Sequence, residues 1–438
     1  METLRIVMLS DWFLPRVGGV EVSIDELSRG LSREGHEVFV VSHSYRVNNV
    51  MPELELREGF YVYRVRTGLL ARDDVTYDPL AVAKAALFIK RNAVDVVHAH
   101  GLSSTLSLLG SMIASGGTGV PVVLTNHSLI GSSLNPLART LLRYALKWPA
   151  ELTGVSRAAA LDISRVSGRP AEVVPNCIDI KRWRSLAKSN DEVPVDGDPS
   201  IIITSRLSPR KNPLEIAAVA RLVVKELPRA VFYVIGDGSL ARDLRETLGR
   251  EGLDGRVRML GIMPRERLPG ILASADMFVL TSYRESFGIS VLEAMALGVP
   301  VVVYSSPGVL DLVDHMVNGA IVNGPEEMAR MIVRLSSDEA LRRRLSQEAA
   351  LKAVQFDCRA VVPRYLDVYR RSMQDKCCVS DRRFLAYRLF RLLVGDPVKK
   401  GEWCFDRKLR YNERASRSKK GAVPVFRRGA GRAALLCN

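Results

Sequence analysis

Short apolar runs alternate with segments of helical period along most of this chain. The runs at 4–10, 37–43, 94–100 and 121–127 are rich in Val, Ile and Leu, and each is short enough for one buried strand. Between the first two, 21–35 repeats its apolar positions every three or four residues, as an amphipathic helix does. Strands that alternate with helices favour βαβ units, so the pattern predicts an α/β fold with doubly wound parallel sheets.

The alternation is interrupted once, by a polar segment that contains Pro and Gly. This segment, 176–198, predicts a linker between two domains. We therefore predict an N-terminal Rossmann-like domain at 1–175, a C-terminal Rossmann-like domain at 199–355 and a final helix at 356–373. Within the second domain, strands are expected at 200–205, 230–236, 256–261, 276–281 and 299–304, and one long helix at 325–354.

The chain has 438 residues and a formal net charge of +15, most of which lies at its C-terminal end. Residues 374–438 contain 17 Lys or Arg against 6 Asp or Glu, which accounts for +11 of that charge. The pattern places no core in this basic tail, and we leave its order open. The tail could attract an anionic membrane surface, bind nucleic acid non-specifically, or do neither.

The sequence contains no recognisable targeting segment and no recognisable cysteine motif. No apolar run reaches the ~18 residues of a membrane-spanning helix, and the N-terminus lacks a signal-peptide pattern, so an intracellular protein is expected. The six cysteines form no C-x-x-C pair, and four of them lie in the basic tail. We therefore expect neither a disulfide nor a cysteine metal site.

The segment ESFGISVLE places two carboxylates, Glu285 and Glu293, eight residues apart around a turn that contains Gly288. A strand pattern at 277–282 precedes it, and a helix pattern at 291–298 follows. Glu285 should therefore lie on the loop that leaves the strand, next to a helix N-terminus. Open α/β sheets bind ligands at this edge, where backbone N–H groups attract phosphate.

Two further loops carry groups suited to phosphate. Gly18 and Gly19 directly follow the first predicted strand, so the backbone there can approach a phosphate closely at the start of a helix. The loop SRLSPRKN follows the first strand of the second domain, and its cations include Arg206 and Lys211. Either loop alone would be read as an ordinary turn or a solvated basic surface.

Taken together and in this order, the motifs resemble those of the retaining glycosyltransferases with a GT-B fold, the glycosyl transferase group 1 family. The resemblance implies two domains that face each other across a cleft, with the helix at 356–373 crossing back to the first domain. It implies that Arg206 and Lys211 hold the diphosphate of a nucleotide-sugar donor. It also implies that Glu285 contacts a hydroxyl of the donor sugar and that Glu293 contacts the ribose.

The same resemblance assigns roles to residues on three other strand ends. Gly236 and Asp237 form a G-x-G turn, which is implied to lie near the base and ribose of the donor. It is not a G-x-G-x-x-G loop and does not support a dehydrogenase. His127, in TNHSLIG, is implied to lie in the cleft beside the reacting sugar carbon. His100, in VVHAHG, is a candidate contact for the acceptor, although an isolated His is more often structural.

Two segments are similar to the catalytic subunits of phosphatidylinositol N-acetylglucosaminyltransferases: SDWFLPRVGGVEVSIDELSRGL at 10–31 and TNHSLIG at 125–131. This implies transfer of N-acetylglucosamine from UDP-N-acetylglucosamine to a phosphatidylinositol-like lipid. A mannosyltransferase that uses GDP-mannose, or another transferase of glycolipid, polysaccharide or glycoprotein glycan synthesis, remains the alternative. A non-catalytic nucleotide-sugar or nucleic-acid binder is the third hypothesis. The chain departs from the family pattern at two positions. Asp311 stands near the position where the family usually has a Glu, and Cys177 stands where it usually has a Gly.

The segment 135–150 has a helical pattern in which Arg139, Arg143 and Lys147 form a basic stripe at four-residue spacing. Apolar neighbours accompany the stripe, as in a helix that lies on an anionic bilayer. An ordinary surface helix is the alternative. We expect a cytoplasmic protein that binds peripherally to the inner face of a membrane.

The reaction implied by the resemblance needs no cofactor, because the nucleotide sugar is itself a substrate. No Asp-x-Asp motif occurs in the matching region, and cationic side chains can replace a metal at the diphosphate, so metal independence is expected. The expected partners are the donor, a lipid-linked or glycan acceptor and the membrane surface. Nucleic-acid binding is not expected, and the sequence does not determine the oligomeric state.

Overall fold

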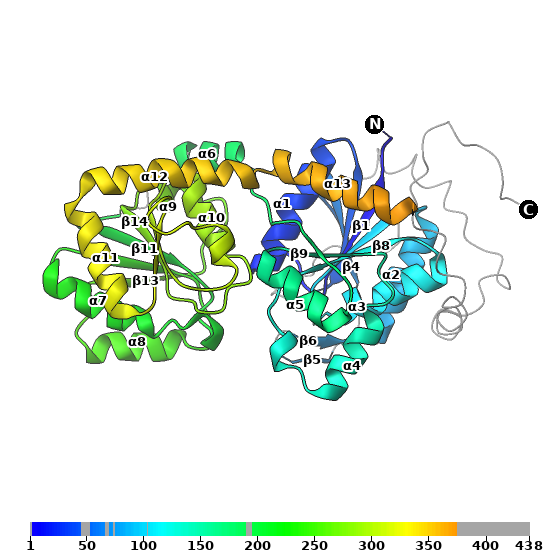
Figure 1. Cartoon of the computed structure of the whole chain (residues 1–438), viewed down its shortest axis with the longest axis horizontal. Helices are drawn as coiled ribbons and strands as arrows, with labels where there is room; N and C mark the ends of the chain where they lie inside the picture. Colours follow the sequence, from blue (N-terminus) through cyan, green and yellow to red (C-terminus); the bar gives the residue numbers. More distant parts are fainter. Residues whose placement is uncertain are drawn as a thin grey trace, which may run out of the picture.

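The computed structural model describes residues 2–44, 53–65, 70–72, 75–102, 104–189 and 195–374. Two α/β domains lie side by side, the N-terminal one coloured blue to cyan and the C-terminal one green to yellow in Figure 1. The basic tail expected at 374–438 lies outside the described residues, apart from Gln374.

The N-terminal domain is built on an eight-stranded sheet with the strand order β10-β9-β8-β7-β1-β2-β4-β3. Every pair in it is parallel except β3 with β4, as doubly wound units require. Its strands are β1 (Arg5–Leu9), β2 (Glu37–His43), β3 (Leu54–Arg57), β4 (Phe60–Val65), β7 (Val96–His100), β8 (Val122–Asn126), β9 (Glu151–Gly154) and β10 (Glu172–Val173). Two further strands, β5 (Leu70–Arg72) and β6 (Val75–Tyr77), form a separate antiparallel pair.

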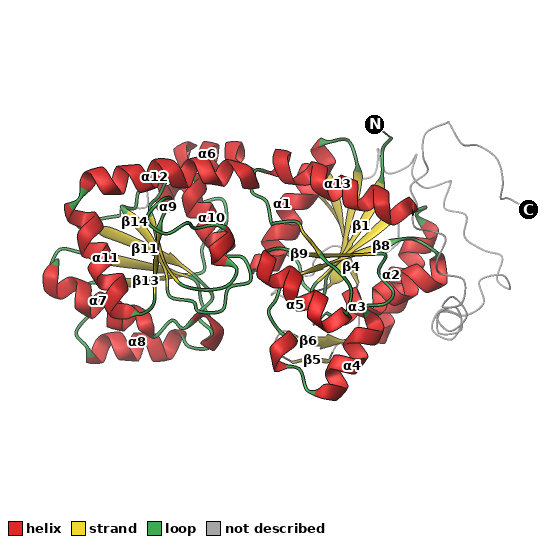
Figure 2. Ribbon diagram, viewed as in Figure 1, coloured by secondary structure: helices red, strands yellow, loops and turns green. Residues whose placement is uncertain are grey.

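Helices cover both faces of this sheet (Figure 2). The reason is visible in β1, where Ile6 and Met8 enter one apolar core while Val7 and Leu9 enter the other. A strand buried on both faces must be apolar throughout, which is why it reads as a continuous run rather than an alternating one. The helices are α1 (Gly19–Arg33), α2 (Pro79–Arg91), α3 (Thr105–Ile113), α4 (Pro136–Ala145) and α5 (Arg157–Ser167), with short turns η1 (Ala114–Thr118) and η2 (Gly131–Ser133).

The C-terminal domain has a six-stranded, all-parallel sheet in the order β13-β12-β11-β14-β15-β16. The chain therefore moves outward from β11 to one edge, returns, and continues from β14 to the other edge. The strands are β11 (Ser200–Thr204), β12 (Val231–Ile235), β13 (Val257–Gly261), β14 (Met277–Leu280), β15 (Val301–Tyr304) and β16 (Ala320–Val322). The prediction of doubly wound parallel sheets is confirmed in both domains.

Helices also flank both faces of the second sheet. They are α7 (Glu215–Glu226), α8 (Ala241–Arg250), α9 (Leu268–Ala273), α10 (Ile289–Ala296), α11 (Pro325–Ser337) and α12 (Glu339–Ala353), with turns η3 (Pro209–Lys211) and η4 (Val309–Asp311). The expectation of one helix over 325–354 was wrong, because the chain breaks at Asp338. The Asp338 side chain accepts a hydrogen bond from the Leu341 N–H and so caps the start of α12.

Two stretches of chain connect the domains, and they run beside each other. The first contains α6 (Ile180–Ser189), so the segment expected to be a linker is partly helical. Its Trp183 is buried, and α6 packs on α9 and α10. The second runs through η5 (Val354–Phe356) into α13 (Cys358–Gln374), which packs on α1, β7, β8 and β9 of the N-terminal domain. The Ile178 N–H donates to the Phe356 carbonyl at 3.0 Å.

A disulfide joins these two connections. It pairs Cys177, just before α6, with Cys358, the first residue of α13. The expectation that no disulfide forms was therefore wrong. The two cysteines are 181 residues apart, and only the return of the chain to the N-terminal domain brings them together, so no local spacing could have indicated the pair.

Candidate functional site

Both sheets reverse their strand order near the domain interface. The reversal lies between β1 and β7 in the N-terminal sheet and between β11 and β14 in the C-terminal sheet. Ligands of open α/β sheets bind beyond the carboxyl ends of the strands at such points. The loops that leave β1, β8, β11 and β14 carry, in that order, Gly18, His127, Arg206 and Glu285. Contacts between these loops join the two domains.

The glycine loop and the first basic loop meet across the interface. A Cβ atom added to Gly18 would lie 2.6 Å from Nη2 of Arg206 and 2.5 Å from a carboxylate oxygen of Glu21. A Cβ added to Gly19 would lie 3.7 Å from the side chain of Ile289, in the first turn of α10. A side chain at Gly18 would therefore displace the ends of the Arg206 and Glu21 side chains, whereas the φ of −163° is open to any residue. The glycine loop, Arg206 and the start of α10 therefore form one contiguous region.

The second cation of the basic loop contacts the first glutamate of the E-x7-E motif. Lys211 lies in η3, and its Nζ forms an ion pair with Oε1 of the buried Glu285. The Glu285 carbonyl accepts a hydrogen bond of 2.9 Å from the Gly308 N–H. A Cβ on Gly308 would lie 2.2 Å from the carbonyl carbon of Ser286, so only glycine permits this approach. The structure therefore brings Lys211 and Glu285 together.

Glycines shape the two turns that support these loops. Gly288 precedes α10 with a φ of +95°, the left-handed region that glycine tolerates best. In the GDG turn, a Cβ on Gly236 would lie 2.0 Å from the Ser205 carbonyl oxygen. The Leu207 N–H donates to the Asp237 carbonyl at 2.9 Å, and the Asp237 side chain is exposed. The GDG turn therefore holds the loop that carries Arg206.

His127 also lies at the domain interface. Its carbonyl accepts a 2.6 Å hydrogen bond from Oγ of Ser286, the residue that follows Glu285. Its Nε2 lies 3.0 Å from Nδ1 of His100. His100 is only 2% exposed, and its contact with the acceptor stays a prediction. Burial lowers the pKa of His127 to about 3.

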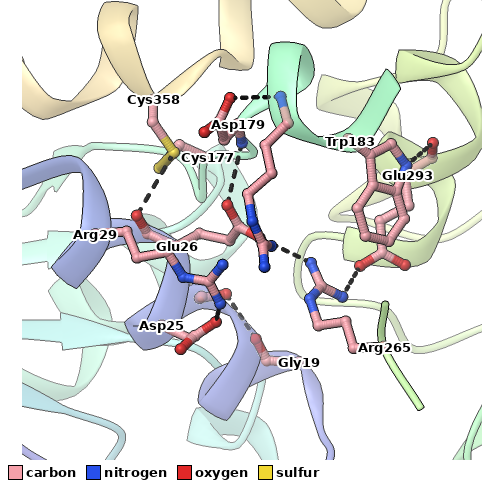
Figure 3. A network of polar contacts seen from close by, with 12 residues as sticks. Gly19, Asp25, Glu26, Arg29, Cys177, Asp179, Trp183, Arg265, Glu293 and Cys358 are labelled. Atoms are coloured by element: carbon pink, nitrogen blue, oxygen red, sulfur yellow. Dashed lines mark hydrogen bonds and ion pairs between the residues drawn. A yellow bond between two sulfur atoms is a disulfide. The ribbon is translucent and has the colours of Figure 1, made fainter. Parts of the chain in front are cut away.

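The second glutamate of the motif lies in a separate polar network between the domains (Figure 3). Glu293 is buried in α10, and its Oε1 accepts a 2.5 Å hydrogen bond from Nη1 of Arg265. Arg265 also donates to Glu26 of α1 at 3.1 Å, and its guanidinium lies 4.7 Å from the Trp183 ring centroid. Burial raises the pKa of Glu293, although Arg265 opposes the shift. The ribose contact of Glu293 stays a prediction.

Asp311, which lies near the position where the family usually has a Glu, also contacts the opposite domain. Asp311, in η4, accepts a 2.6 Å hydrogen bond from the backbone N–H of Arg157 and a 2.5 Å bond from its Nε. Arg157 is the first residue of α5 in the N-terminal domain. The loop 305–313 therefore supports Glu285 through Gly308 and contacts the N-terminal domain through Asp311.

Two family models match the chain, and together they cover both domains. "Glycosyltransferase Family 4" matches residues 17–182, and "Glycosyl transferases group 1" matches residues 186–352. The chain is also 30% identical over 426 residues to one subunit of the phosphatidylinositol N-acetylglucosaminyltransferase of Arabidopsis thaliana, covering 90% of this chain and 92% of that protein. The protein is a group 1 glycosyltransferase.

Other relatives of this glycosyltransferase include the GPI3 subunit of the same enzyme in Saccharomyces cerevisiae, 27% identical over 71% of the chain and 70% of that protein. Among solved structures, HepE of Anabaena in complex with UDP and glucose superposes with a TM-score of 0.68 at 20% identity, covering 84% and 99% of the two chains. Sucrose-phosphate synthase of Thermosynechococcus elongatus gives a TM-score of 0.69 at 19% identity, covering 84% and 98%. These likenesses confirm the expected GT-B fold.

The basic stripe of the glycosyltransferase lies on the surface of its N-terminal domain. The helix expected over 135–150 ends at Ala145 as α4, because Leu146 and Trp148 turn into the core. Arg139, Arg143 and Lys147 are all exposed. Arg139 also donates to the Gly131 carbonyl at 2.8 Å, so it helps hold the turn before the helix.

A row of apolar side chains accompanies these cations on α4. Leu137, Leu141 and Tyr144 are 70%, 62% and 44% exposed and follow one another at helical spacing. Of the helices that the structure describes, none is both long and apolar enough to cross a bilayer. The exposed face of α4 therefore combines apolar and cationic groups on a helix too short to span a membrane.

A cavity of about 460 Å³ lies outside this site, between α6 and the junction of η5 with α13. Its cations, Lys181, Arg184, Lys188 and Arg359, are all exposed, and none of the candidate site residues lines it. Within the described ranges, no cluster of three or more His, Cys, Asp or Glu has the geometry to hold a metal ion.

Proposed function

We propose that this glycosyltransferase retains anomeric configuration and transfers N-acetylglucosamine from UDP-N-acetylglucosamine to a phosphatidylinositol-like lipid. The observation that carries the proposal is the convergence of Gly18, Arg206, Lys211, Glu285 and His127 between the two domains. The names of the relatives support the sugar and the lipid, and the UDP in complexes of structural neighbours supports the nucleotide.

In this proposal the diphosphate lies between the basic loop and the first turn of α10. Arg206 and Lys211 supply two positive charges, and the N-terminal N–H groups of α10 add roughly half a charge. Lys211 then contacts both the phosphate and Glu285, and Glu285 lies against the donor sugar. Because Glu285 is paired with a cation, we assign it to binding and positioning and assign no covalent nucleophile.

The donor and acceptor are tested together by a transfer assay. The protein is incubated with phosphatidylinositol vesicles and radiolabelled UDP-N-acetylglucosamine, UDP-glucose or GDP-mannose, and labelled lipid and released nucleotide are measured. We expect labelled lipid from UDP-N-acetylglucosamine and its loss in Glu285→Ala. Labelled lipid from GDP-mannose alone would favour the mannosyltransferase alternative. Activity that persists in excess EDTA is expected, and its loss would refute metal independence.

We also propose that the protein binds the cytoplasmic face of a membrane through α4. Its exposed Leu137, Leu141 and Tyr144 can enter the interface, while Arg139 and Arg143 contact anionic headgroups at about 1 kcal/mol each. Peripheral binding beside the cleft would bring a lipid headgroup to the site without a membrane-spanning helix.

Vesicle co-sedimentation tests the role of α4. We expect Arg139→Glu/Arg143→Glu to weaken binding to phosphatidylinositol vesicles by at least ~30-fold, because about 2 kcal/mol of attraction is lost and repulsion is added. Arg330→Glu/Arg334→Glu, an exposed pair at the same spacing on α11, is the matched control. Equal binding by the two variants would refute the membrane role of α4.

A further inference from the structure

The rings of His100 and His127 form a pair at the carboxyl ends of β7 and β8. His100 Nδ1 lies 3.0 Å from His127 Nε2, so one ring donates a hydrogen bond to the other. The second nitrogen of His127, Nδ1, has no hydrogen-bond partner among the residues that the structure describes. This atom is also not among the fully buried, unpartnered side-chain nitrogens and oxygens, so it is the nitrogen that a ligand can contact.

Both rings are neutral near physiological pH. Burial lowers the pKa of His127 to about 3, and burial, reinforced by the neighbouring His98 and His127, lowers the pKa of His100 well below 6.5. A neutral imidazole has one N–H donor and one acceptor nitrogen. The position of one proton on His100 therefore determines the position of the proton on His127.

The other ring nitrogen of His100 contacts Met8. The Met8 thioether sulfur is 3.4 Å from Nε2 of His100 and is fully buried in β1. A thioether can accept a hydrogen bond but has no proton to donate, so this contact is favourable only when Nε2 carries the proton. Nδ1 of His100 is then the acceptor, and His127 must donate to it through its Nε2–H.

We propose that His100, oriented by Met8, is a positioning residue that holds His127 as its Nε2–H tautomer, so that Nδ1 of His127 accepts a hydrogen bond from a hydroxyl of the bound sugar. The sugar as ligand rests on the proposed function. The tautomer follows from the contacts of Met8, His100 and His127 alone.

This arrangement separates two binding tasks. An unprotonated, neutral Nδ1 has no proton to offer to an anionic phosphate oxygen, which is an acceptor only. It accepts readily from a sugar hydroxyl, which can donate. His127 therefore selects a hydroxyl, while the diphosphate is left to Arg206 and Lys211. The low pKa of His127 also makes its imidazole a weak base, which fits binding rather than proton abstraction.

Nitrogen-15 NMR of histidine-labelled full-length protein tests the tautomer directly, since protonated and unprotonated ring nitrogens have well-separated shifts. The chain has six histidines, and single substitutions assign their signals. His36 and His315 serve as internal references, because each accepts a backbone N–H at Nδ1, at 3.1 Å, and must carry its proton on Nε2 when neutral. We expect His100 and His127 to match these references. A His127 signal with the proton on Nδ1 would overturn the proposal.

Three variants test the consequence for catalysis. His100→Leu removes the acceptor for His127, and we expect about a tenfold loss of kcat/KM with UDP-N-acetylglucosamine. His100→Asn places an amide oxygen close to the former Nδ1 and should restore most of that loss. Met8→Leu keeps a similar volume but removes the sulfur acceptor, so we expect mixed His100 tautomers in the NMR spectrum and a smaller loss of activity.

The outcomes separate the positioning role from a structural role and from the donor assignment. Equal losses in His100→Leu and His100→Asn would mean that His100 acts only through packing, which contradicts the proposal. Absence of turnover by the wild type with UDP-N-acetylglucosamine would refute the proposed donor, and the NMR result would still decide the tautomer.

Discussion

Replacing Arg265 with Met should destabilise the protein strongly, because Arg265 is the cation shared by two buried carboxylates. Its guanidinium donates to Glu26 of the N-terminal domain at 3.1 Å and to Glu293 of the C-terminal domain at 2.5 Å. The side chains of Arg265, Glu26 and Glu293 are 9%, 2% and 4% exposed, so water cannot solvate the two carboxylates once the guanidinium is removed. Breaking a buried ion pair by removing one partner costs about 3–5 kcal/mol, and we expect a loss of that size at pH 7.5.

The loss should shrink as the pH falls. Burial already raises the pKa of Glu293, and Arg265 is the largest influence that lowers it, so its removal raises that pKa further. A carboxyl whose pKa is higher in the folded than in the unfolded state binds a proton on folding, which favours the folded state as pH falls toward the unfolded pKa. The slope is at most about 1.4 kcal/mol per pH unit for one proton.

Urea unfolding at pH 7.5 and pH 5.5 measures both effects. Arg267→Met is the matched control, because Arg267 is an exposed cation in the same loop. The triple variant Glu26→Gln/Arg265→Met/Glu293→Gln should recover much of the stability, since no charge is then buried alone. Stability of Arg265→Met within about 1 kcal/mol of the control at both pH values would refute the reasoning, as would a deficit that grows at low pH.

Two further predictions concern the disulfide and the glycine loop. Cys177→Ser/Cys358→Ser should lower the unfolding temperature measured without reductant, because a cross-link over 181 residues contributes roughly 5 kcal/mol by chain entropy; equal melting of wild type and variant would contradict the disulfide. Gly18→Ala should weaken UDP binding without a loss of stability, because its Cβ would displace the Arg206 guanidinium. Gly19→Ala is the control, because its methyl group would lie at an ordinary contact distance from Ile289 of α10. Equal UDP affinity of the two alanine variants would refute the placement of Arg206.

The strands and the loops that carry the candidate residues could be predicted because each depends on a local pattern. A buried parallel strand is a short apolar run, and a loop that follows it must lie at the carboxyl edge of its sheet. The positions of Gly18, Lys211 and Glu285 beside strand ends needed nothing more. The family resemblance then supplied what the local pattern could not, which was that the two edges face each other.

What the sequence did not indicate depends on contacts between distant segments. Arg265 lies in a polar loop with no motif, and its importance comes only from Glu26, which is 239 residues away. His100 and His127 lie at the ends of neighbouring strands, and only the 3.0 Å distance between Nδ1 of His100 and Nε2 of His127 shows that their rings form a hydrogen bond. Tertiary packing also ended α4 early, because Trp148 is buried rather than on the helix surface.

The central claim is that cations of the C-terminal domain hold a donor diphosphate at the domain interface, and calorimetric binding of UDP and of uridine tests it most directly. We predict that Lys211→Met weakens UDP binding by about 10- to 100-fold and leaves uridine binding unchanged, because in the proposed site Lys211 contacts the diphosphate and neither the base nor the ribose. Arg210→Met, which removes the exposed neighbouring cation in the same turn, should bind UDP as the wild type does. Equal UDP affinity of Lys211→Met and Arg210→Met would contradict the claim.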